Sequence, residues 1–590
     1  MKAASRPKKD LSLLWAILFF SALTVWMTWP LATRMQDWMV GQMGDNVYFV
    51  WMIGWMKKAL FELHVNPFDV WFLNYPEGWN MAYTEITPIM LALALPFSFL
   101  GGATFAYNMA MMLSFVLSGL GMYLWVRYLT GRSDAALVAG TIFAFVPYHF
   151  AHFLIGHLNL SGTQWFPFYF LGLFQLLEGR DAAGWKQLAW KPAVLAGVTL
   201  GLIALTSQYY VYMALIVSAF LVALDVLLLD RSRLKNLGYW RNLVVMGLVS
   251  LPLVLVAIAP YVSLSQQGGL PDRNLGIVRL YSASPTDFLL PSTDHFLWGA
   301  WIGSHFNRDM WVEGTLYIGI VSLALGGIAW WQRKALNHSR TVVWLLWGAL
   351  FAMVLAMGTD LHWLGQPVEL NLPAFLAERL HRDTLPLILP GYVLFQYFPF
   401  YAKLRALMRF GVFVLVFSAA AAGLGAAWVL QRVRPAWRLG ALVSLLALVC
   451  LDFYPGPYQE FTHVEPRPVD YWLAAQPGDG ALIQFPFIEG EDQEQTYYTL
   501  VHGKPFVGGF FNAFPPAQYS RLKPIMEAFP DQQSIDLLPE LGVEYVLVHA
   551  DQYPDLDALR QVLEANGIHY VDEMGGQMIF ELTPTGGTQP

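Results

Sequence analysis

The sequence is poor in cysteine and in charged residues. Cys450 is the single cysteine among 590 residues, which excludes a disulfide framework and a multi-cysteine metal site. Asp, Glu, Lys and Arg together make up 13% of the chain against 56% hydrophobic residues, and a soluble protein of this composition would be hard to keep in water. The composition therefore indicates a membrane protein.

Long apolar runs fill the first three quarters of the chain. Most are long enough to cross about 30 Å of hydrocarbon as an α-helix. We expect a polytopic α-helical membrane domain over residues 1–453 with about eleven spans. These are a retained signal anchor at 11–30 and runs near 104–127, 135–154, 159–178, 192–208, 209–229, 242–262, 312–331, 341–357, 409–431 and 437–453.

Basic residues in the short loops predict the orientation of these spans. Lys and Arg concentrate in alternate loops, within 127–132, 180–191, 231–241, 333–340 and 432–438, and such loops stay cytoplasmic. The N-terminus is then cytoplasmic, and segments 31–103, 263–311 and 358–408 are external, as is the tail. We therefore expect the chemistry on the extracytoplasmic side of a prokaryotic plasma membrane.

Three shorter apolar segments leave the span count open. Segments 47–62 and 86–101 either both cross the membrane, which would give thirteen spans, or both lie in its interface. We favour two interfacial helices within the first external loop, because both segments are short and Pro88 and Pro96 interrupt the second. Segment 384–400, which contains three prolines, is interpreted as a re-entrant or interfacial piece.

Residues 454–590 form a second compositional region. This region carries 20 acidic against 5 basic residues, whereas 1–453 carries 22 against 30, so its charge argues against nucleic-acid binding. Turn residues follow Tyr454, after which strands are predicted at 481–487, 543–549 and 577–582 and helices at 516–528 and 555–566. We expect a soluble extracytoplasmic α/β domain that shapes access to the membrane domain.

Several short motifs resemble one family of membrane enzymes. They are Gly44-Asp45, Asn66-Pro67-Phe68, Tyr75-Pro76-Glu77-Gly78, His157-Leu158-Asn159 with Ser161-Gly162-Thr163-Gln164-Trp165, and Glu313-Gly314-Thr315-Leu316-Tyr317. With the layout of residues 1–453, this set resembles the lipid-dependent GT-C glycosyltransferases, in particular the prokaryotic members loosely called family-39-like. The chain lacks the paired Asp-Glu of better-known branches of that superfamily.

The resemblance implies a reaction and a catalytic residue. An acidic side chain in the first external loop would activate an acceptor hydroxyl, which attacks the anomeric carbon of a hexose or pentose carried on a polyprenyl phosphate, most simply with inversion. Asp45 matches that role as general base. Partial desolvation at the membrane surface can raise the pKa of a carboxyl group toward the range useful for proton abstraction. The alternative is that Asp45 caps a helix beginning at Asn46.

The lipid phosphate that leaves would need fixed cations. Arg405 and Arg409, spaced i, i+4 where the span 409–431 begins, are the candidates for binding the donor phosphate, because guanidinium groups bind phosphate bidentately. The alternative is that both side chains simply reach toward lipid headgroups, as basic residues at span ends commonly do.

Five further residues are predicted to line the pocket: Glu85, His157, Asn159, Gln164 and Glu313. Glu313, at the mouth of a span, is expected to pair with Arg405 or Arg409. A divalent metal held by His149, His152 and His157 with Asp45 or Glu85 is conceivable, but ordinary interfacial histidines explain this cluster better, so no metal site is assigned.

Other functions remain open at this point. A transporter or lipid flippase would fit the number of spans, but such proteins place ionisable groups near mid-membrane and often show two similar halves, and neither feature is evident. A polymerase or ligase using a lipid-linked glycan would keep the same phosphate site, and an assembly protein that lost its chemistry would keep the fold. The acceptor is a glycan, lipid or protein, and the sequence does not identify the sugar.

Overall fold

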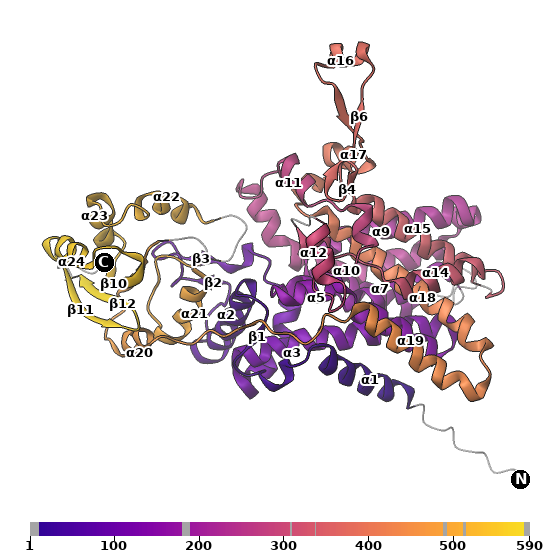
Figure 1. The fold of residues 1–590 in the computed structure, drawn as a ribbon, viewed down its shortest axis with the longest axis horizontal. Coiled ribbons are helices and arrows are strands. Elements are labelled where there is room, and N and C mark those ends of the chain that lie inside the picture. The colour runs from indigo at the N-terminus through magenta and orange to yellow at the C-terminus, as the bar shows by residue number, and fades with distance from the viewer. Residues whose placement is uncertain are drawn as a thin grey trace, which may run out of the picture. The chain divides into compact units, whose positions relative to one another are not determined.

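The computed structural model describes residues 11–179, 189–306, 310–336, 338–487, 492–510 and 515–582 (Figure 1). These residues form two compact units. The first contains 11–33, 87–90 and 110–459, and the second contains 34–86, 91–109 and the residues from Glu460 onward. Helix α3 (Pro88–Thr130) contributes to both units, and its backbone departs from helical geometry at Gly101 and Gly102.

The first unit is built almost entirely of helices. Besides α3, its helices are α1 (Ser12–Met27), α4 (Ser133–Ala144), α5 (Pro147–Leu154), α6 (Leu158–Ser161), α7 (Trp165–Glu178), α8 (Trp190–Thr206), α9 (Gln208–Leu224), α10 (Leu237–Gln266), α11 (Leu275–Leu280), α12 (Gly299–His305), α13 (Trp311–Gly314), α14 (Ile320–Trp331), α15 (Ser339–Ala356), α16 (Ala374–Leu380), α17 (Pro390–Tyr397), α18 (Gly411–Arg432) and α19 (Arg438–Phe453). Two short hairpins join them, β4 (His362–Trp363) with β5 (Gln366–Pro367) and β6 (Glu369–Asn371) with β7 (Thr384–Pro386).

Seven helical segments in the described residues are long and apolar enough to cross a membrane. They are 88–130, 133–154, 208–229, 237–266, 339–356, 407–432 and 435–453, and the shorter apolar helices α1, α8 and α14 lie where further spans were predicted. The chain is therefore a multi-pass membrane protein, as its composition indicated. The exact number of spans stays a prediction.

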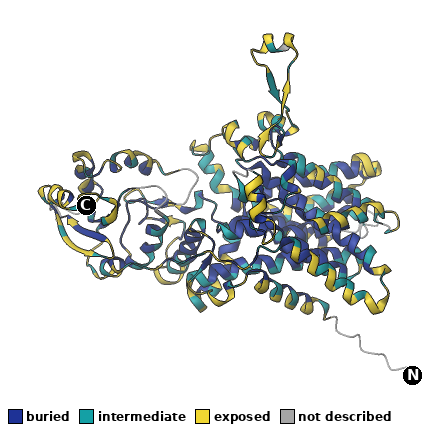
Figure 2. Cartoon of the chain, in the orientation of Figure 1, coloured by how far each residue is buried: buried dark blue, intermediate teal, exposed yellow. Residues whose placement is uncertain are grey.

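Helix α18 is among the most completely buried long helices of the first unit, and Figure 2 shows this core in dark blue. Its alanines and glycines allow neighbouring helices to approach closely. A Cβ atom on Gly425 would come within 1.9 Å of the Leu325 carbonyl oxygen of α14, and one on Gly423 would meet Val126 of α3 at 2.6 Å. Small residues thus determine the packing around α18.

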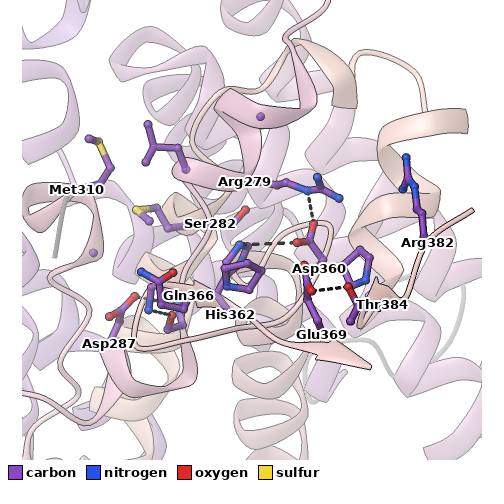
Figure 3. A pocket seen from close by; sticks show the side chains of 18 of the residues that line it. Arg279, Ser282, Asp287, Met310, Asp360, His362, Gln366, Glu369, Arg382 and Thr384 are labelled. Carbon is purple, nitrogen blue, oxygen red and sulfur yellow. Dashed lines mark hydrogen bonds and ion pairs between the residues drawn. The ribbon is translucent and has the colours of Figure 1, made fainter. Parts of the chain in front are cut away.

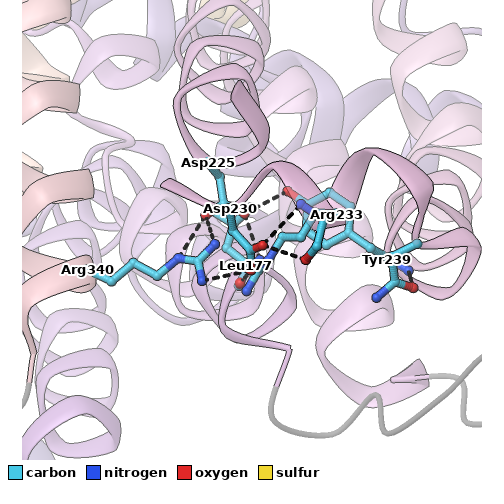
Figure 4. A network of polar contacts seen from close by, with 8 residues as sticks. Leu177, Asp225, Asp230, Arg233, Tyr239 and Arg340 are labelled. Atoms are coloured by element: carbon cyan, nitrogen blue, oxygen red, sulfur yellow. Dashed lines mark hydrogen bonds and ion pairs between the residues drawn. The ribbon is translucent and has the colours of Figure 1, made fainter. Parts of the chain in front are cut away.

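A network of charged residues lies at the C-terminal end of α9 (Figure 4). Asp225, which is fully buried, accepts hydrogen bonds from Arg233 Nη1 at 2.6 Å and Arg340 Nε at 2.9 Å. Tyr239 also donates to Asp225, and Asp230 pairs with both arginines. Basic residues of two loops predicted to be cytoplasmic therefore hold a buried carboxylate.

The second unit combines part of the first predicted external loop with the C-terminal region. It contains β1 (Met39–Val40), α2 (Asp45–Lys58), β2 (Asp69–Val70), β3 (Trp79–Asn80), β8 (Phe461–Thr462), α20 (Pro468–Ala475), β9 (Ala481–Phe485), α21 (Asp492–His502), α22 (Ala517–Met526), α23 (Gln532–Glu540), β10 (Val543–His549), α24 (Leu556–Ala565), β11 (Ile568–Met574) and β12 (Gln577–Leu582). Its main sheet has the order β11-β12-β10-β9, with β9 and β10 parallel. Strands β10 and β12 match their predicted ranges.

Packing within this unit explains the apolar residues at 47–55, the first part of the apolar run at 47–62. Helix α2 buries Phe49, Trp51, Ile53 and Trp55, and it packs against α21, where Trp51 Nε1 donates to Thr499 Oγ1 at 3.2 Å. Strand β1 also pairs with β8, more than 400 residues away in sequence. Interfacial placement of 47–62 and 86–101, and a soluble domain limited to 454–590, stay predictions.

Candidate active site

Asp45 is the first residue of α2, in the second unit. Gly44 is the residue preceding the helix, and no side chain caps it, so the alternative role of Asp45 as an N-cap is not what the structure shows. The buried Asn46 amide holds the turn, because its Oδ1 accepts from Gly44 N at 2.9 Å and its Nδ2 donates to the Gln42 carbonyl at 3.0 Å. Asp45 is half-buried at the positive end of the helix dipole, which favours a carboxylate.

Glu85 lies in the same unit as Asp45, a few residues before α3 begins, and is also half-buried. The remaining predicted site residues belong to the first unit.

Glu313 and Arg409 form a buried ion pair in the first unit. Arg409 Nε donates to both carboxylate oxygens of Glu313, at 2.9 and 3.1 Å, and Arg409 Nη2 also donates to Oε1. The two residues are 5% and 4% exposed, and the guanidinium lies over the Tyr209 ring at 4.7 Å. The predicted pairing of Glu313 is therefore confirmed, with Arg409 as its partner.

Glu313 lies before α14 begins. Burial raises the pKa of its carboxyl group, but the charge and hydrogen bonds of Arg409, together with His152 and His157, lower this pKa to about 2. Glu313 therefore stays ionised at neutral pH.

Two histidines continue this ion pair into a chain of polar contacts. His152 Nε2 lies 3.9 Å from Glu313 Oε2, and His152 Nδ1 lies 2.8 Å from His157 Nδ1. His157, which directly precedes α6, is thus linked through His152 to Glu313 and Arg409. The structure brings three of the predicted residues together, His157, Glu313 and Arg409, through His152, which is not among the residues predicted to line the pocket.

Asn159 and Gln164 are also buried, and each makes a polar contact with a residue outside the His152–His157 pair. Asn159 Oδ1 accepts from Leu160 N at 3.0 Å, and Gln164 Nε2 lies 3.0 Å from the Met90 sulfur. Gln164 Oε1 is buried without a hydrogen-bond partner in the described residues. The role of Gln164 in lining the pocket stays a prediction, and its Oε1 is the atom that could accept a hydrogen bond from a ligand.

Arg405 and Arg409 do not share a helical face. Helix α18 begins at Gly411, a 3₁₀ turn covers Leu407–Phe410, and Arg405 lies before that turn, so the i, i+4 relation does not apply. Arg405 is half-buried with its guanidinium 4.8 Å from the Tyr281 ring centre, and it makes no ion pair or hydrogen bond with any residue in the described ranges. Its polar atoms, unlike those of Arg409, are not held by a carboxylate.

The first unit also contains a polar cavity of about 690 Å³ (Figure 3). Its walls come from α11 and the turn after it, from the loop after α15 and from the base of the β6–β7 hairpin. Gly314 and Met408, the neighbours of Glu313 and Arg409, also line it. The charged and imidazole side chains in its wall are Arg279, Arg382, Asp287, Asp360, Glu369, Asp383 and His362.

The Asp360 carboxylate is the most buried of these groups. It is 1% exposed, and its Oδ1 accepts from Arg279 Nε at 2.8 Å and from Thr359 Oγ1 at 2.7 Å. His362 Nε2 lies 3.7 Å from Asp360 Oδ2. Burial lowers the pKa of His362, which is therefore a neutral imidazole near pH 7.

Asp360 and His362 are not among the site residues predicted from the sequence. A signal was present, because Gly358-Thr359-Asp360 directly follows an apolar run and opens a segment predicted to be external. As for a metal, no group of three or more His, Cys, Asp or Glu side chains in the described ranges is arranged to hold one.

Comparison with known proteins identifies the family. A family model described as "Domain of unknown function (DUF6311)" matches residues 13–382, which is more than half of the chain. The chain belongs to this family. No curated protein matches the sequence. The matched region includes Asp45, Glu313, Asp360 and His362, whereas Arg405 and Arg409 lie beyond it.

Solved structures of glycosyltransferases share the fold. Oligosaccharyltransferase AglB from Archaeoglobus fulgidus, in complex with an inhibitory peptide and a dolichol-phosphate, matches at a TM-score of 0.52 and 15% identity, over 92% of this chain and 70% of that one. Arabinofuranosyltransferase AftD from Mycobacteria matches at 0.55 and 14%, over 98% and 42%. ArnT from Cupriavidus metallidurans matches at 0.48 and 12%, over 98% and 100%. The AglB and AftD matches confirm the predicted GT-C-like fold.

Proposed function

We propose that this DUF6311 protein is an integral-membrane glycosyltransferase that moves a sugar from a polyprenyl-phosphate donor to an extracytoplasmic acceptor. The observation that carries the proposal is the GT-C-like fold over more than nine tenths of the chain, shared with two enzymes named as glycosyl-group transferases. One of them is described with a dolichol-phosphate. The proposal includes a prokaryotic plasma membrane, a cytoplasmic N-terminus and external loops that carry the chemistry.

Asp45 is the general base in this proposal. It is half-buried at the N-terminus of α2, so it is neither fully solvated nor sealed inside the protein. In the reaction, its carboxylate accepts the proton of the acceptor hydroxyl while the oxygen attacks the anomeric carbon. The bond from that carbon to the phosphate oxygen breaks, and the lipid phosphate leaves as an anion.

Arg405 is the cation that we assign to the donor phosphate. Its guanidinium is stacked near Tyr281 and has no carboxylate partner in the described part of the chain. Arg409 supports the same segment through Glu313, because a phosphate that recruited Arg409 would leave the Glu313 carboxylate buried without its cation. Of the two arginines predicted to bind the phosphate, Arg405 is thus proposed as the binding residue and Arg409 as a supporting residue.

Transfer of labelled sugar tests the proposal. Purified full-length protein in lipid nanodiscs is incubated with radiolabelled polyprenyl-phosphate hexoses and pentoses and an envelope fraction as acceptor. Asp45→Asn should lower turnover by about 10²- to 10⁴-fold, the usual contribution of a positioned base. Arg405→Gln should raise the KM for the donor while the KM for the acceptor stays unchanged.

Matched variants show whether these effects are specific. Asp69→Asn removes an exposed carboxylate from the same predicted external loop and should leave turnover unchanged. Arg405→Lys keeps the charge but loses the planar fork, and it should fall between wild type and Arg405→Gln. Equal turnover in Asp45→Asn would remove Asp45 as the base, and the absence of transfer from every donor by the wild type would contradict the transferase function.

A further inference from the structure

The wall of the cavity next to the Glu313–Arg409 pair contains two buried polar atoms without a hydrogen-bond partner in the described residues. Asp360 Oδ2 and His362 Nδ1 have no hydrogen bond within the described residues, and the two side chains are 1% and 6% exposed. Asp360 and His362 lie side by side in the cavity wall (Figure 3). A buried acceptor left without a donor costs about 1–3 kcal/mol, and more for a charged group, so such groups are rare in folded proteins and call for an explanation.

The backbone around Asp360 is held from both sides, so the open oxygen is not the result of a loose segment. Ala283 N donates to the Ala356 carbonyl at 2.8 Å, and Leu389 N donates to the Thr359 carbonyl at 2.9 Å. Gly358, at a φ of +80°, allows this close approach, because a Cβ atom there would lie 1.9 Å from Ser282 Oγ. With Arg279 and Thr359 fixing Oδ1, the second oxygen is held in place.

The chemistry of the cavity favours a neutral ligand rich in hydroxyl groups. Four carboxylates and two guanidinium groups line the cavity, and the Arg279 guanidinium already donates to Asp360. An excess of carboxylates disfavours a phosphate, whereas a hydroxyl group can donate to Asp360 Oδ2. His362 is neutral, so its ring offers one donor and one acceptor to a second hydroxyl. Vicinal hydroxyls of a sugar ring present this pattern.

We infer that the cavity is a sugar-binding subsite, in which Asp360 accepts a hydrogen bond from one ring hydroxyl and His362 binds its neighbour. The volume of about 690 Å³ lies within the range of small-molecule sites, about 300–1,000 Å³. Glu369, whose carboxylate accepts from Thr384 Oγ1 at 2.6 Å, belongs to the hairpin wall, so the β6–β7 hairpin closes one side of the subsite. This inference rests on the proposed function for the source of the sugar, which is either the lipid-linked donor or the acceptor glycan.

Binding measurements on the full-length protein in nanodiscs test the subsite. Three probes are titrated: polyprenyl phosphate, the same lipid carrying a hexose or pentose, and free glycan fragments from the envelope. If the sugar comes from the donor, the sugar-bearing lipid binds about tenfold or more tightly than the bare lipid. If the sugar comes from the acceptor, the free glycan binds, and both lipids bind equally.

Two variants localise the binding to the cavity. Asp360→Asn and His362→Gln should each weaken the sugar-dependent binding by about tenfold and leave affinity for bare polyprenyl phosphate unchanged. His362→Gln is included because Asp360→Asn also weakens the contact with Arg279. Asp134→Asn is the matched control, since it removes the charge from another Arg–Asp pair outside the cavity lining.

The outcomes separate the subsite from the transferase function. Full sugar-dependent binding in both Asp360→Asn and His362→Gln would overturn the subsite, as would a wild type in which no probe gains affinity from its sugar. Sugar binding that depends on Asp360, in a wild type that transfers no sugar, would support the subsite and contradict the transferase. Transfer with sugar binding that is independent of Asp360 would do the reverse.

Discussion

Replacing Arg409 by methionine should destabilise the membrane domain strongly. The substitution keeps much of the side-chain volume but removes the cation that pairs with the buried Glu313 carboxylate. The nearest other basic group, His152 Nε2, lies 3.9 Å from that carboxylate, beyond hydrogen-bond distance. The Glu313 pKa falls from 4.5 to about 2 in the folded protein, where burial alone would raise it. At about 1.4 kcal/mol per pKa unit, this difference corresponds to about 3 kcal/mol. Breaking a buried ion pair typically costs about 3–5 kcal/mol.

A double-mutant cycle separates this pair from other effects. Arg409→Met and Glu313→Gln should each lower the free energy of unfolding by about 3 kcal/mol or more, because each leaves one uncompensated buried charge. The double variant should lose much less than the sum, which gives a coupling energy of about 3 kcal/mol. Unfolding is followed by SDS titration of the protein in mixed micelles at pH 7.

The pH dependence gives a second measure of the same pair. Because the folded-state pKa of Glu313 is lower than its unfolded value, its stabilisation is complete above pH of about 4.5 and is lost as the pH falls toward 2. The difference in the free energy of unfolding between wild type and Glu313→Gln should therefore stay constant between about pH 6 and about pH 8. Additive effects of the two single substitutions, with a coupling energy below about 0.5 kcal/mol, would refute the reasoning.

Two further predictions concern packing and acid stability. Burial lowers the pKa of His502 from 6.5 to about 3, so its contribution to stability is complete above pH 6.5 and is lost as the pH falls toward 3. The loss of stability between pH 7 and pH 5, followed by thermal unfolding, should be about 2 kcal/mol smaller in His502→Gln than in wild type and should be unchanged in a variant of the exposed His569. Gly425→Ala should cost about 1–3 kcal/mol, because its Cβ would meet the Leu325 carbonyl at 1.9 Å and force α14 and α18 apart. Gly440→Ala, where a Cβ meets nothing within 4 Å, should be neutral, and equal melting temperatures for both alanine variants would contradict the packing argument.

Hydropathy was sufficient to locate the long helices of the first unit. The predicted spans 341–357, 409–431 and 437–453 correspond to α15, α18 and α19 within a few residues. Each such run is apolar over enough consecutive residues that helix is the way to satisfy its backbone in a membrane. Local composition carries this information directly.

Composition could not show which apolar segments pack against protein. The apolar residues at 47–55 are buried where α2 packs against α21 in the second unit, and a hydropathy profile cannot separate that burial from contact with lipid. The pairing of β1 with β8 is similarly invisible, because two-residue strands more than 400 positions apart leave no periodic signal. Contacts of this kind depend on the whole fold.

The candidate site shows the same division between local and long-range information. Glu313 and an arginine at the start of α18 could be paired by charge and expected depth alone. The open oxygen of Asp360 could not be foreseen, because it results from the 387–389 segment and the 282–283 turn holding the backbone on either side. His362 becomes part of the cavity only through the β4–β5 hairpin.

The two arginines show why spacing alone could not assign the phosphate site. As an i, i+4 pair on an ideal helix, Arg405 and Arg409 would be equivalent cations, but the chain enters α18 through a 3₁₀ turn that separates them. Arg409 is held by a buried carboxylate, so binding a phosphate there would require breaking a pair worth about 3 kcal/mol. Binding a phosphate at Arg405 would break no such ion pair, because Arg405 has no carboxylate partner in the described residues. If the proposed transferase uses either residue for its donor, Arg405→Gln should therefore change donor binding at unchanged stability, whereas Arg409→Met should change stability first.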